Sequence, residues 1–262
     1  MSKKIAVLSD LHSGHKAGLT HPGFLPSEPV ERDAPFVDAA KAYWGFFEGR
    51  IKAHDPFDIV IVNGDLVDGP GKKSGGIEEW TTDMDTQCEM AIRALRRVPV
   101  HRKTKWVMTR GTPYHTGEAE DHEDKIAAVF DAKIGEHEWV DIEGVVFDLK
   151  HHPAGSSGVP QGRHTGVAKD RMWNIMWANE ELQPSADVFI RSHVHYHNFC
   201  GGPDWLALTT PALQGFGSRY GARRCTGVVD FGFLTFEVNK GAFSWSKHIA
   251  KLEQQKATVT KL

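Results

Sequence analysis

The sequence has few cysteines, no long apolar run and no strong charge imbalance. Its three cysteines, Cys88, Cys200 and Cys225, form no C-x-x-C pair, so we predict reduced, buried thiols in a reducing compartment, the cytoplasm. No stretch is long enough to cross a bilayer, and the apolar run at residues 5–8 is too short for a signal peptide. We therefore expect no membrane partner.

The formal net charge is only −3, which gives no general attraction for nucleic acid. Any contact with DNA or RNA would have to be local. The chain contains no internal repeat, no low-complexity segment and no convincing linker. We predict one domain over residues 1–262, a length that α/β folds often reach without division.

Short apolar runs alternate with amphipathic segments through the first three quarters of the chain, as in β-α-β units. Strands are predicted at residues 5–8, 58–62, 105–109, 145–149 and 187–191, and helices at 36–53, 78–98, 121–130 and 167–182. Trp173 and Trp177 stand at helical spacing and are predicted to pack in the core.

Beyond residue 195 the pattern changes to short runs at residues 205–209, 227–238 and 242–249, which indicate antiparallel strands. Two stacked, mixed sheets flanked by helices satisfy both parts of the chain. We therefore predict an α/β fold, a four-layer α-β-β-α sandwich.

Five clusters of potential metal ligands lie at or next to the ends of apolar, strand-like runs, in order along the chain. They are Asp10-Leu11-His12, the segment Gly64 to Asp68, the segment Arg110 to His115, His151-His152-Pro153, and the segment Ser192 to His195. The carboxyl ends of strands form the ligand crevice of open α/β sheets, so these clusters are expected to meet. Isolated histidines and aspartates at strand ends usually only cap turns, but five ordered clusters favour a metal centre.

The composition of each cluster suits shared metal ligation. In the D-x-H and H-x-H segments the ligands are two apart, and an extended backbone would point both side chains to one face. Asp65 follows a buried strand and Gly64, which permits a tight turn, and its carboxylate can bridge two ions. Mixed carboxylate and imidazole ligands suit zinc, manganese or iron and disfavour calcium. Asp68 is interpreted as a residue that supports a metal ligand rather than as a ligand itself.

The order of these clusters over residues 5–195 resembles that of the calcineurin-like metallophosphoesterases, whose motifs are D-x-H, G-D-x-x-D, G-N-H-D/E, H and G-H-x-H. The resemblance implies one metal ion on Asp10, His12, Asp65 and His195, and a second on Asp65, His151 and His193. His151 is preferred to His152 because the family's ligand commonly opens an H-x-P-like turn. The implied cofactors are two divalent ions, manganese, zinc, iron or nickel rather than magnesium.

The third cluster departs from the family pattern and resembles variants from phages and bacteria. Thr112 stands where the family has a ligating asparagine, and Pro113 where it has a histidine that protonates the leaving group. If the loop is longer, His115 becomes either a metal ligand or the general acid, and we assign it as the catalytic acid. Ser192 replaces the family's last glycine, a small change.

The resemblance implies hydrolysis of phosphate esters, with phosphodiesters or nucleotides as the favoured substrates, by a hydroxide that bridges the metal ions. Arg110 and Arg163 are predicted to bind the substrate, because guanidinium matches phosphate oxygens. Segment 14–32 is either a loop over the site or a surface excursion. The alternatives are a DNA or RNA nuclease or end-processing phosphatase, and an inactive protein-binding scaffold with the same fold. The sequence makes no prediction of the oligomeric state.

Overall fold

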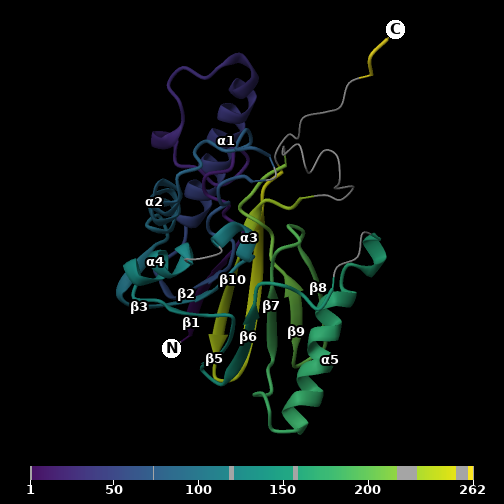
Figure 1. Cartoon of the computed structure of the whole chain (residues 1–262). Helices are drawn as coiled ribbons and strands as arrows, with labels where there is room; N and C mark the ends of the chain where they lie inside the picture. Colours follow the sequence, from purple (N-terminus) through teal and green to yellow (C-terminus); the bar gives the residue numbers. More distant parts are fainter. Residues whose placement is uncertain are drawn as a thin grey trace.

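The computed structural model describes residues 2–72, 74–117, 121–155, 159–216, 229–251 and 259–261. Two mixed β-sheets lie face to face, with helices on their outer sides (Figure 1). Of the cysteines, Cys88 is buried and Cys200 is partly exposed, and both are free thiols, whereas Cys225 lies outside the described residues. None of the described helices is both long and apolar enough to span a membrane.

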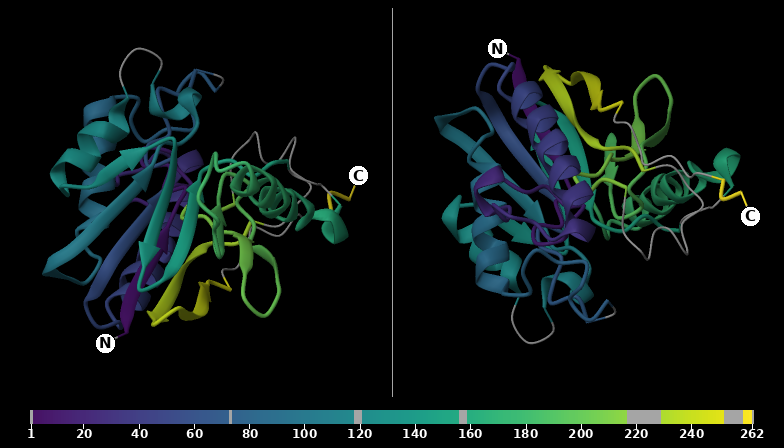
Figure 2. Two further views of the ribbon diagram at one scale, coloured as in Figure 1. Left: turned by 90° about the horizontal axis from the view of Figure 1, so that it is seen from below. Right: turned by 90° about the horizontal axis from the view of Figure 1, so that it is seen from above.

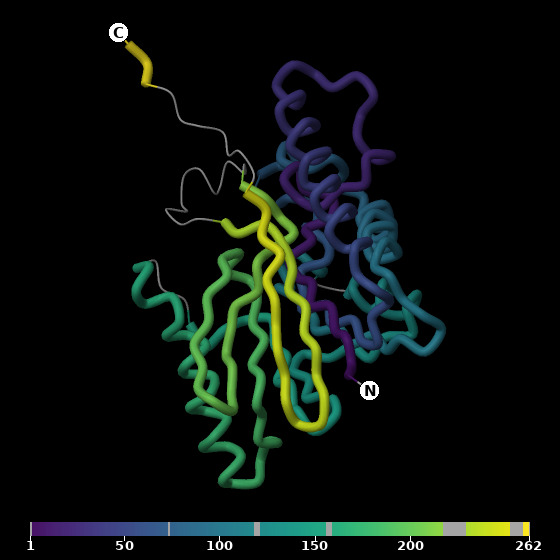
Figure 3. The backbone as a smooth tube through the Cα atoms, turned by 180° about the vertical axis from the view of Figure 1, so that it is seen from behind, coloured from purple at the N-terminus to yellow at the C-terminus, as the bar shows by residue number. Residues whose placement is uncertain are grey.

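The first sheet has six strands in the order β11-β10-β1-β2-β3-β4. Its bounds are β1 Lys3–Leu8, β2 Phe57–Asn63, β3 Val100–Thr109, β4 Lys133–Gly135, β10 Gly232–Asn239 and β11 Ala242–Ile249. Strands β1 to β4 are parallel, whereas β10 is antiparallel to both β1 and β11. Seen from behind in Figure 3, β10 and β11 run beside the N-terminal strand. The sheet therefore joins segments from both parts of the chain.

The second sheet has five strands in the order β5-β6-β7-β9-β8. Its bounds are β5 His137–Ile142, β6 Val145–Lys150, β7 Val188–Arg191, β8 Asn198–Gly201 and β9 Leu206–Thr209. The central strands β6, β7 and β9 are parallel, and the edge strands β5 and β8 are antiparallel to their neighbours. Segment 205–209 was predicted to be antiparallel, but its strand also continues the parallel core beside β7.

Alternate residues of a strand point to opposite faces of the sheet, so their contacts show which layer packs on each face. In β1, Ala6 and Leu8 pack with Trp44 of the first helix, whereas Ile5 and Val7 pack against the second sheet. A third apolar cluster lies between the second sheet and its own helix. The helices are α1 Ala34–Ile51, α2 Met84–Leu95, α3 Pro113–Thr116, α4 His122–Val129 and α5 Thr165–Asn179. Figure 2 shows α1, α2 and α4 on one side of the sheets and α5 on the other, which confirms the predicted four-layer sandwich.

Helix α2 begins six residues later than predicted because the segment before it hydrogen-bonds to the loop at residues 14–16. Trp80 N–H donates to the Gly14 carbonyl at 2.7 Å, and Lys16 N–H donates to the Glu78 carbonyl at 2.8 Å. The helix then begins after Asp83, whose carboxylate accepts from the Thr86 N–H at 2.8 Å as an N-cap. Segment 14–20 is buried, whereas residues 21–33 are mostly exposed and include the short 3-10 helices Pro22–Phe24 and Glu31–Asp33.

Sequence analysis missed three strands and placed two tryptophans in the core that are exposed. Strands β4, β5 and β8 were not predicted, because they are short or contain charged residues that hide the alternation. Trp173 and Trp177 do not pack in the core: 46% and 42% of their surfaces are exposed. The helical spacing was right, but spacing does not determine which face of a helix points inward.

Candidate metal centre

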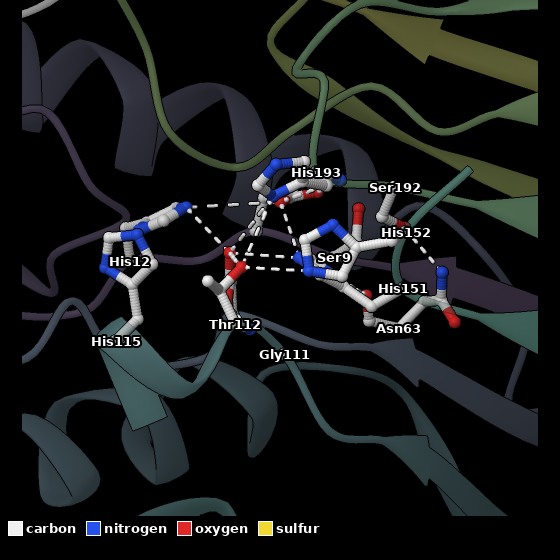
Figure 4. Close-up of polar contacts among 12 residues, drawn as sticks. Ser9, His12, Asn63, Gly111, Thr112, His115, His151, His152, Ser192 and His193 are labelled. Atoms are coloured by element: carbon white, nitrogen blue, oxygen red, sulfur yellow. Dashed lines mark hydrogen bonds and ion pairs between the residues drawn. The ribbon is translucent and has the colours of Figure 1, made fainter. Parts of the chain in front are cut away.

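A buried hydrogen-bond network joins the two sheets at the carboxyl ends of their strands. The Asn63 amide donates to the Ser192 hydroxyl at 2.6 Å and to the Lys150 carbonyl at 3.1 Å, and accepts from the Thr109 hydroxyl at 2.8 Å. Thr210 continues the network by donating to Ser192 at 2.9 Å. Figure 4 shows Asn63 and Ser192 beside the clustered histidines. The network fixes the strand ends from which the predicted ligands project, and Ser192 contributes a hydroxyl that glycine would lack.

Five of the predicted ligands have left-handed backbone. The φ angles are 50° for Asp10, 43° for His12, 53° for Asp65, 68° for His193 and 54° for His195. The expected extended D-x-H and H-x-H segments are therefore wrong. The loops instead hydrogen-bond to each other, with Asp10 N–H donating to the Gly64 carbonyl at 2.9 Å and His12 N–H to the Asp65 carbonyl at 3.0 Å. Such conformations cost on the order of 1–3 kcal/mol each and concentrate at functional sites.

Two glycines allow the loops to approach one another. A Cβ on Gly64, which has a φ of +81°, would lie 2.5 Å from His151 Nδ1, and one on Gly111 would lie 2.1 Å from Asp65 Oδ1. Any side chain at either position would displace a predicted ligand. The expected tight turn at Gly64 is present. The need for glycine at position 111 was not predicted.

Asp10, His12 and His195 form one group of donors, which we call the buried half. His195 Nε2 lies 3.3 Å from Asp10 Oδ1 and 3.2 Å from His12 Nε2. His12 is only 4% exposed at its side chain, and its Nδ1 donates to Asp68 Oδ1 at 2.7 Å. A carboxylate on Nδ1 leaves Nε2 directed at the centre and increases its basicity. Asp68 therefore occupies the supporting position predicted for it.

His151 and His193 form a second group, which we call the open half. His151 Nε2 lies 3.0 Å from Asp65 Oδ2, and its Nδ1 donates to the Asn63 carbonyl at 2.7 Å. His193 Nδ1 lies 4.0 Å from the same Asp65 oxygen, and its side chain is 40% exposed. His152 is also here, with its ring centroid 4.0 Å from that of His193. Of the two adjacent histidines, His151 is the one beside Asp65, and His152 lies at the exposed rim.

Asp65 lies between the two halves. Its Oδ2 is 3.8 Å from His12 Nε2 on one side and 3.0 Å from His151 Nε2 on the other. Thr112 fixes this carboxylate, because its N–H donates to Asp65 Oδ1 at 2.6 Å. The Thr112 hydroxyl lies 3.3 Å from both Asp65 Oδ2 and His193 Nδ1. In Figure 4, Thr112 is in the centre of the group, and its hydroxyl lies between Asp65 and His193.

His115 reaches the buried half from the short helix α3. Its Nδ1 donates to the Asp68 carbonyl at 2.7 Å, and its ring contacts that of His12 edge to face at 4.7 Å. His12, Asp65 and His115 each offer a ligand atom, and these atoms lie within 4.8 Å of one another. With Nδ1 used as a donor, Nε2 is the nitrogen left to hold a proton or a metal ion.

Sequence analysis did not identify Glu123, which hydrogen-bonds to two loops of the centre. It is fully buried, and its two oxygens accept from Leu66 N–H at 2.8 Å and Gly111 N–H at 2.7 Å. Burial, together with the nearby Asp65 carboxylate, raises the pKa of Glu123 to about 8. The only sequence signal is its place in the first turn of α4, where acidic residues are common for other reasons.

A further acidic residue, Glu79, is buried behind Asp68. His15, Asp68 and Glu79 offer ligand atoms within 4.8 Å of one another, and all three are buried. Burial and the Asp68 carboxylate raise the pKa of Glu79 to about 9, so Glu79 is protonated at neutral pH. Glu79 therefore adds no charge beside Asp68, which keeps its own charge: burial opposes ionisation, but the hydrogen bond and charge of His12 hold the Asp68 pKa at about 2.

The electrostatics of the centre favour ionised aspartates. Burial raises the pKa of Asp10, but His195 and His151 outweigh it and hold that pKa below its usual value. Burial also opposes ionisation of Asp65, whose pKa is nevertheless well below its ordinary range because of His151, His193 and His12. The Asp65 charge in turn raises the pKa of His151 to about 10, despite burial. Burial and His193 lower the pKa of His152 to about 4.

This donor set fits divalent metal ions. Two carboxylates and several imidazoles face one another with almost no solvent exposure at Asp10 and Asp65. Ligand atoms of Asp10, His12 and His195 lie within 4.8 Å of one another, as do those of Asp10, Asp65 and His151 and those of His151, His152 and His193. Nitrogen and oxygen donors without thiolate suit zinc, manganese, iron or nickel. Cations at these positions would also compensate the two buried aspartates.

The two predicted substrate arginines have different surroundings. Arg110 pairs with Asp121 at 3.3 Å, Asp124 at 2.7 Å and Glu136 at 3.2 Å, so its guanidinium is already bound to carboxylates. These contacts are a structural use of Arg110, and we do not retain it as a substrate ligand. Arg163 instead stacks on the ring of Tyr196, with its guanidinium carbon 4.6 Å from the ring centroid. Tyr196 follows His195 directly in the chain, so Arg163 contacts the residue next to a predicted ligand.

No protein-family model matches the sequence, and no curated protein matches it. The fold is similar to that of Vps29 from Entamoeba histolytica complexed with zinc, at 14% identity and a TM-score of 0.46, covering 94% of this chain and 98% of that one. An archaeal phosphodiesterase matches at 15% identity and a TM-score of 0.43, covering 93% and 99% of the two chains. A predicted phosphoesterase from Streptococcus pneumoniae TIGR4 matches at 12% identity and a TM-score of 0.42, covering 94% and 89%. Likenesses of this degree carry no argument about function, which has to come from the site itself.

Proposed function

We propose that the protein is a dinuclear metal-dependent phosphoesterase that hydrolyses phosphodiester or nucleotide substrates. One observation carries the proposal: the buried Asp65 carboxylate lies between two groups of nitrogen and oxygen donors, 3.8 Å from His12 Nε2 and 3.0 Å from His151 Nε2. Asp10, His12, Asp65 and His195 would hold one ion, and Asp65, His151 and His193 the other. A carboxylate in this position could bridge two ions and so suits two-metal hydrolysis.

Two divalent cations bound here would supply an activated water molecule and neutralise phosphoryl oxygens. The residues of the chain would orient the groups involved. Asp68 and the Asn63 carbonyl fix the rings of His12 and His151 through their Nδ1 atoms, at 2.7 Å in each case. Thr112 fixes Asp65 through its backbone N–H at 2.6 Å. Preorganisation of this kind reduces the reorganisation needed when charge develops on phosphorus.

The substrate would enter beside the open half. His193 has a side chain that is 40% exposed, and His152 is also exposed, whereas Asp10 is fully buried. Arg163, stacked on Tyr196 next to His195, would supply a cation for the substrate, and guanidinium binds phosphate oxygens in bidentate fashion. Arg163 is therefore the positively charged residue that we propose for the substrate phosphate.

His115 would protonate the leaving group. Its Nδ1–H is fixed on the Asp68 carbonyl at 2.7 Å, so Nε2 is the nitrogen that can deliver a proton. A general acid of this type contributes about 10²- to 10⁴-fold to the rate. An alkoxide leaving group needs this proton, whereas p-nitrophenolate is stable without it.

Metal-dependent hydrolysis tests the proposal. Chelator-stripped protein should be inactive towards bis-p-nitrophenyl phosphate, and manganese, zinc or nickel should restore hydrolysis. His193→Ala should lose the restored activity and about one of two bound ions, whereas His101→Ala, an exposed histidine at the far end of β3, should behave like the wild type. Stripped protein that binds no metal ion would contradict the proposal and support the scaffold alternative.

Leaving-group dependence tests His115. His115→Ala should slow hydrolysis of an alkyl phosphodiester about 100-fold while changing hydrolysis of bis-p-nitrophenyl phosphate only a few-fold. An equal loss on both esters, accompanied by loss of a bound ion, would instead make His115 a metal ligand.

A further inference from the structure

Helix α5 buries two polar residues, Asp170 and Asn174, on the side that faces the protein. Asp170 is buried and accepts from Lys150 Nζ at 3.0 Å, from Ala154 N–H at 2.8 Å and from Arg191 at 3.2 Å. Asn174 is also buried and accepts from Ala186 N–H at 3.0 Å. A helix on the surface of a globular protein normally turns apolar residues inward. In α5 that order is largely reversed.

The outward face of α5 is apolar. Met172, Trp173, Met176 and Trp177 are 49%, 46%, 50% and 42% exposed, and the rings of the two tryptophans stack at 6.4 Å. No charged residue occurs between Met172 and Asn179. Figure 2 shows the helix on the outer side of the second sheet, away from α1, α2 and α4. Contiguous exposed apolar surface of this kind marks an interface.

The order of residues along this face is self-complementary. A stripe along the middle of the exposed face consists of Lys169, Met172, Trp173, Met176, Trp177 and Glu180, with spacings of three, one, three, one and three residues, and Ile175 and Asn179 are exposed to one side of it. Read in the opposite direction, the spacings are identical. Lysine then stands opposite glutamate, and each methionine stands opposite a tryptophan. An antiparallel copy of the same helix therefore complements the stripe in charge and in shape.

We propose that α5 packs antiparallel against α5 of a second copy of this chain, about a two-fold axis that passes between Trp173 and Met176. Met172 would contact Trp177 of the second copy, and Trp173 would contact Met176, pairs in which the thioether meets an aromatic ring. Lys169 would pair with Glu180 at both ends. A two-fold interface uses the same patch on both subunits, which is what a self-complementary stripe provides.

A second copy explains the stripe better than an anionic membrane does. Helices that lie on anionic membranes carry several lysines or arginines beside the apolar face. Here the stripe has one cation at one end and Glu180, followed by Glu181, at the other. This charge order would repel one end of the helix from an anionic surface but matches an antiparallel helix along its whole length.

Sedimentation velocity of the full chain over about 1–100 µM tests the proposal. The wild type should be a dimer, and Met176→Glu, at an exposed helical position, should weaken association on the order of 100-fold. Val129→Glu, at an exposed position of α4, is the matched control and should leave the dimer intact. Circular dichroism and hydrolysis of bis-p-nitrophenyl phosphate establish that each variant folds.

A charge reversal tests the antiparallel register independently of the apolar contacts. Lys169→Glu and Glu180→Lys should each weaken the dimer several-fold, by placing like charges opposite one another, and the double variant should recover wild-type association. A wild type that stays monomeric at 100 µM overturns the proposal. A dimer that Met176→Glu leaves unchanged, or a double variant weaker than either single one, overturns it as well.

Discussion

The two halves of the candidate centre differ most at one histidine each, His12 in the buried half and His193 in the open half, whereas His151 of the open half is as buried as His12. In the buried half, His12 is 4% exposed at its side chain and is held by the Asp68 carboxylate at 2.7 Å. In the open half, His193 is 40% exposed, and its Nδ1 lies 3.3 Å from the neutral hydroxyl of Thr112. The Asp68 carboxylate contacts the His12 nitrogen that is turned away from the centre and so increases the basicity of the other, whereas the Thr112 hydroxyl contacts the His193 nitrogen that faces Asp65.

From this difference we propose a division of labour around Asp65. The buried half has the features of a permanent metal site, with low exposure and a charged supporting residue. The open half has the features of a site that exchanges its ion and meets the substrate. Four substitutions break or sharpen this comparison, beginning with the one that removes the residue common to both halves.

Asp65→Asn should remove the difference between the halves, because both should lose their metal ion. The amide has no charge and only one oxygen, so it cannot bridge two cations. We expect hydrolysis to fall roughly 1,000-fold, equivalent to about 4 kcal/mol of lost charge stabilisation. Metal content measured by mass spectrometry should fall for both ions. Asp38→Asn, at an exposed position of α1, is the control, and an Asp65→Asn enzyme that kept two ions would refute a shared carboxylate.

Asp68→Asn should weaken only the buried half. The asparagine retains a hydrogen-bond acceptor for His12 but lacks the charge that makes the imidazole basic. Affinity for one of the two ions should fall about 10- to 100-fold, while affinity for the other remains within a few-fold. Competition with a chelating dye measures both affinities. Equal weakening of both ions would show that the halves are not separate.

Glu123→Gln should change how the stability of the metal-free protein depends on pH. The pKa of Glu123 is raised to about 8 in the folded protein, by burial and by Asp65, from an ordinary value of 4.5. The folded state therefore holds this proton more tightly, so stability is lost as pH rises between these values, by up to about 1.4 kcal/mol per pH unit.

Urea unfolding in chelator at pH 5, 6, 7 and 8 measures this slope. The difference in unfolding free energy between the wild type and Glu123→Gln should shrink or change sign as pH rises, because the variant has no proton to lose at this position. Glu79 has a raised pKa of about 9 and remains in both proteins, so it cancels in the difference. A difference independent of pH would mean that Glu123 is ionised in the folded protein.

Thr112→Val should have the smallest effect and should fall on the open half. Valine preserves the shape and the backbone N–H to Asp65 but removes the hydroxyl beside His193. The loss of one hydrogen bond is expected to weaken the ion of the open half about 2- to 10-fold. Thr112→Ser, which keeps the hydroxyl, is the control. An effect on the buried half instead would reverse the assignment of Thr112.

The fold and the meeting of the ligand clusters could be predicted because both depend on local pattern. The strands that carry Asp10, Asp65 and His193 are apolar and end at their polar clusters, so topology alone brings the clusters to one edge. Short edge strands such as β4 and β8 have too little pattern to be found in this way.

Apart from Asp68, which stands in the cluster at residues 64–68, the supporting residues of the site could not be predicted, because they act across long separations in sequence. Glu123 is 57 residues from Leu66, to which it is hydrogen-bonded, and no spacing rule connects them. The left-handed backbone at His12 and His195 results from contacts between loops, whereas the D-x-H and H-x-H spacing indicated extended chain. In α5, the inward position of Asp170 depends on Lys150 of β6 and Arg191 of β7.

The position of β1 in the first sheet has a consequence for folding during synthesis. β1 lies between β2 and β10, so Ile5 pairs with Ile59 on one side and with Phe236 on the other. Until residues 232–239 have left the ribosome, β1 is an edge strand with unpaired backbone groups and an apolar sequence, a combination that favours aggregation. A nascent chain that already contains every predicted metal ligand is therefore still exposed at this edge, and it is β10 that closes it.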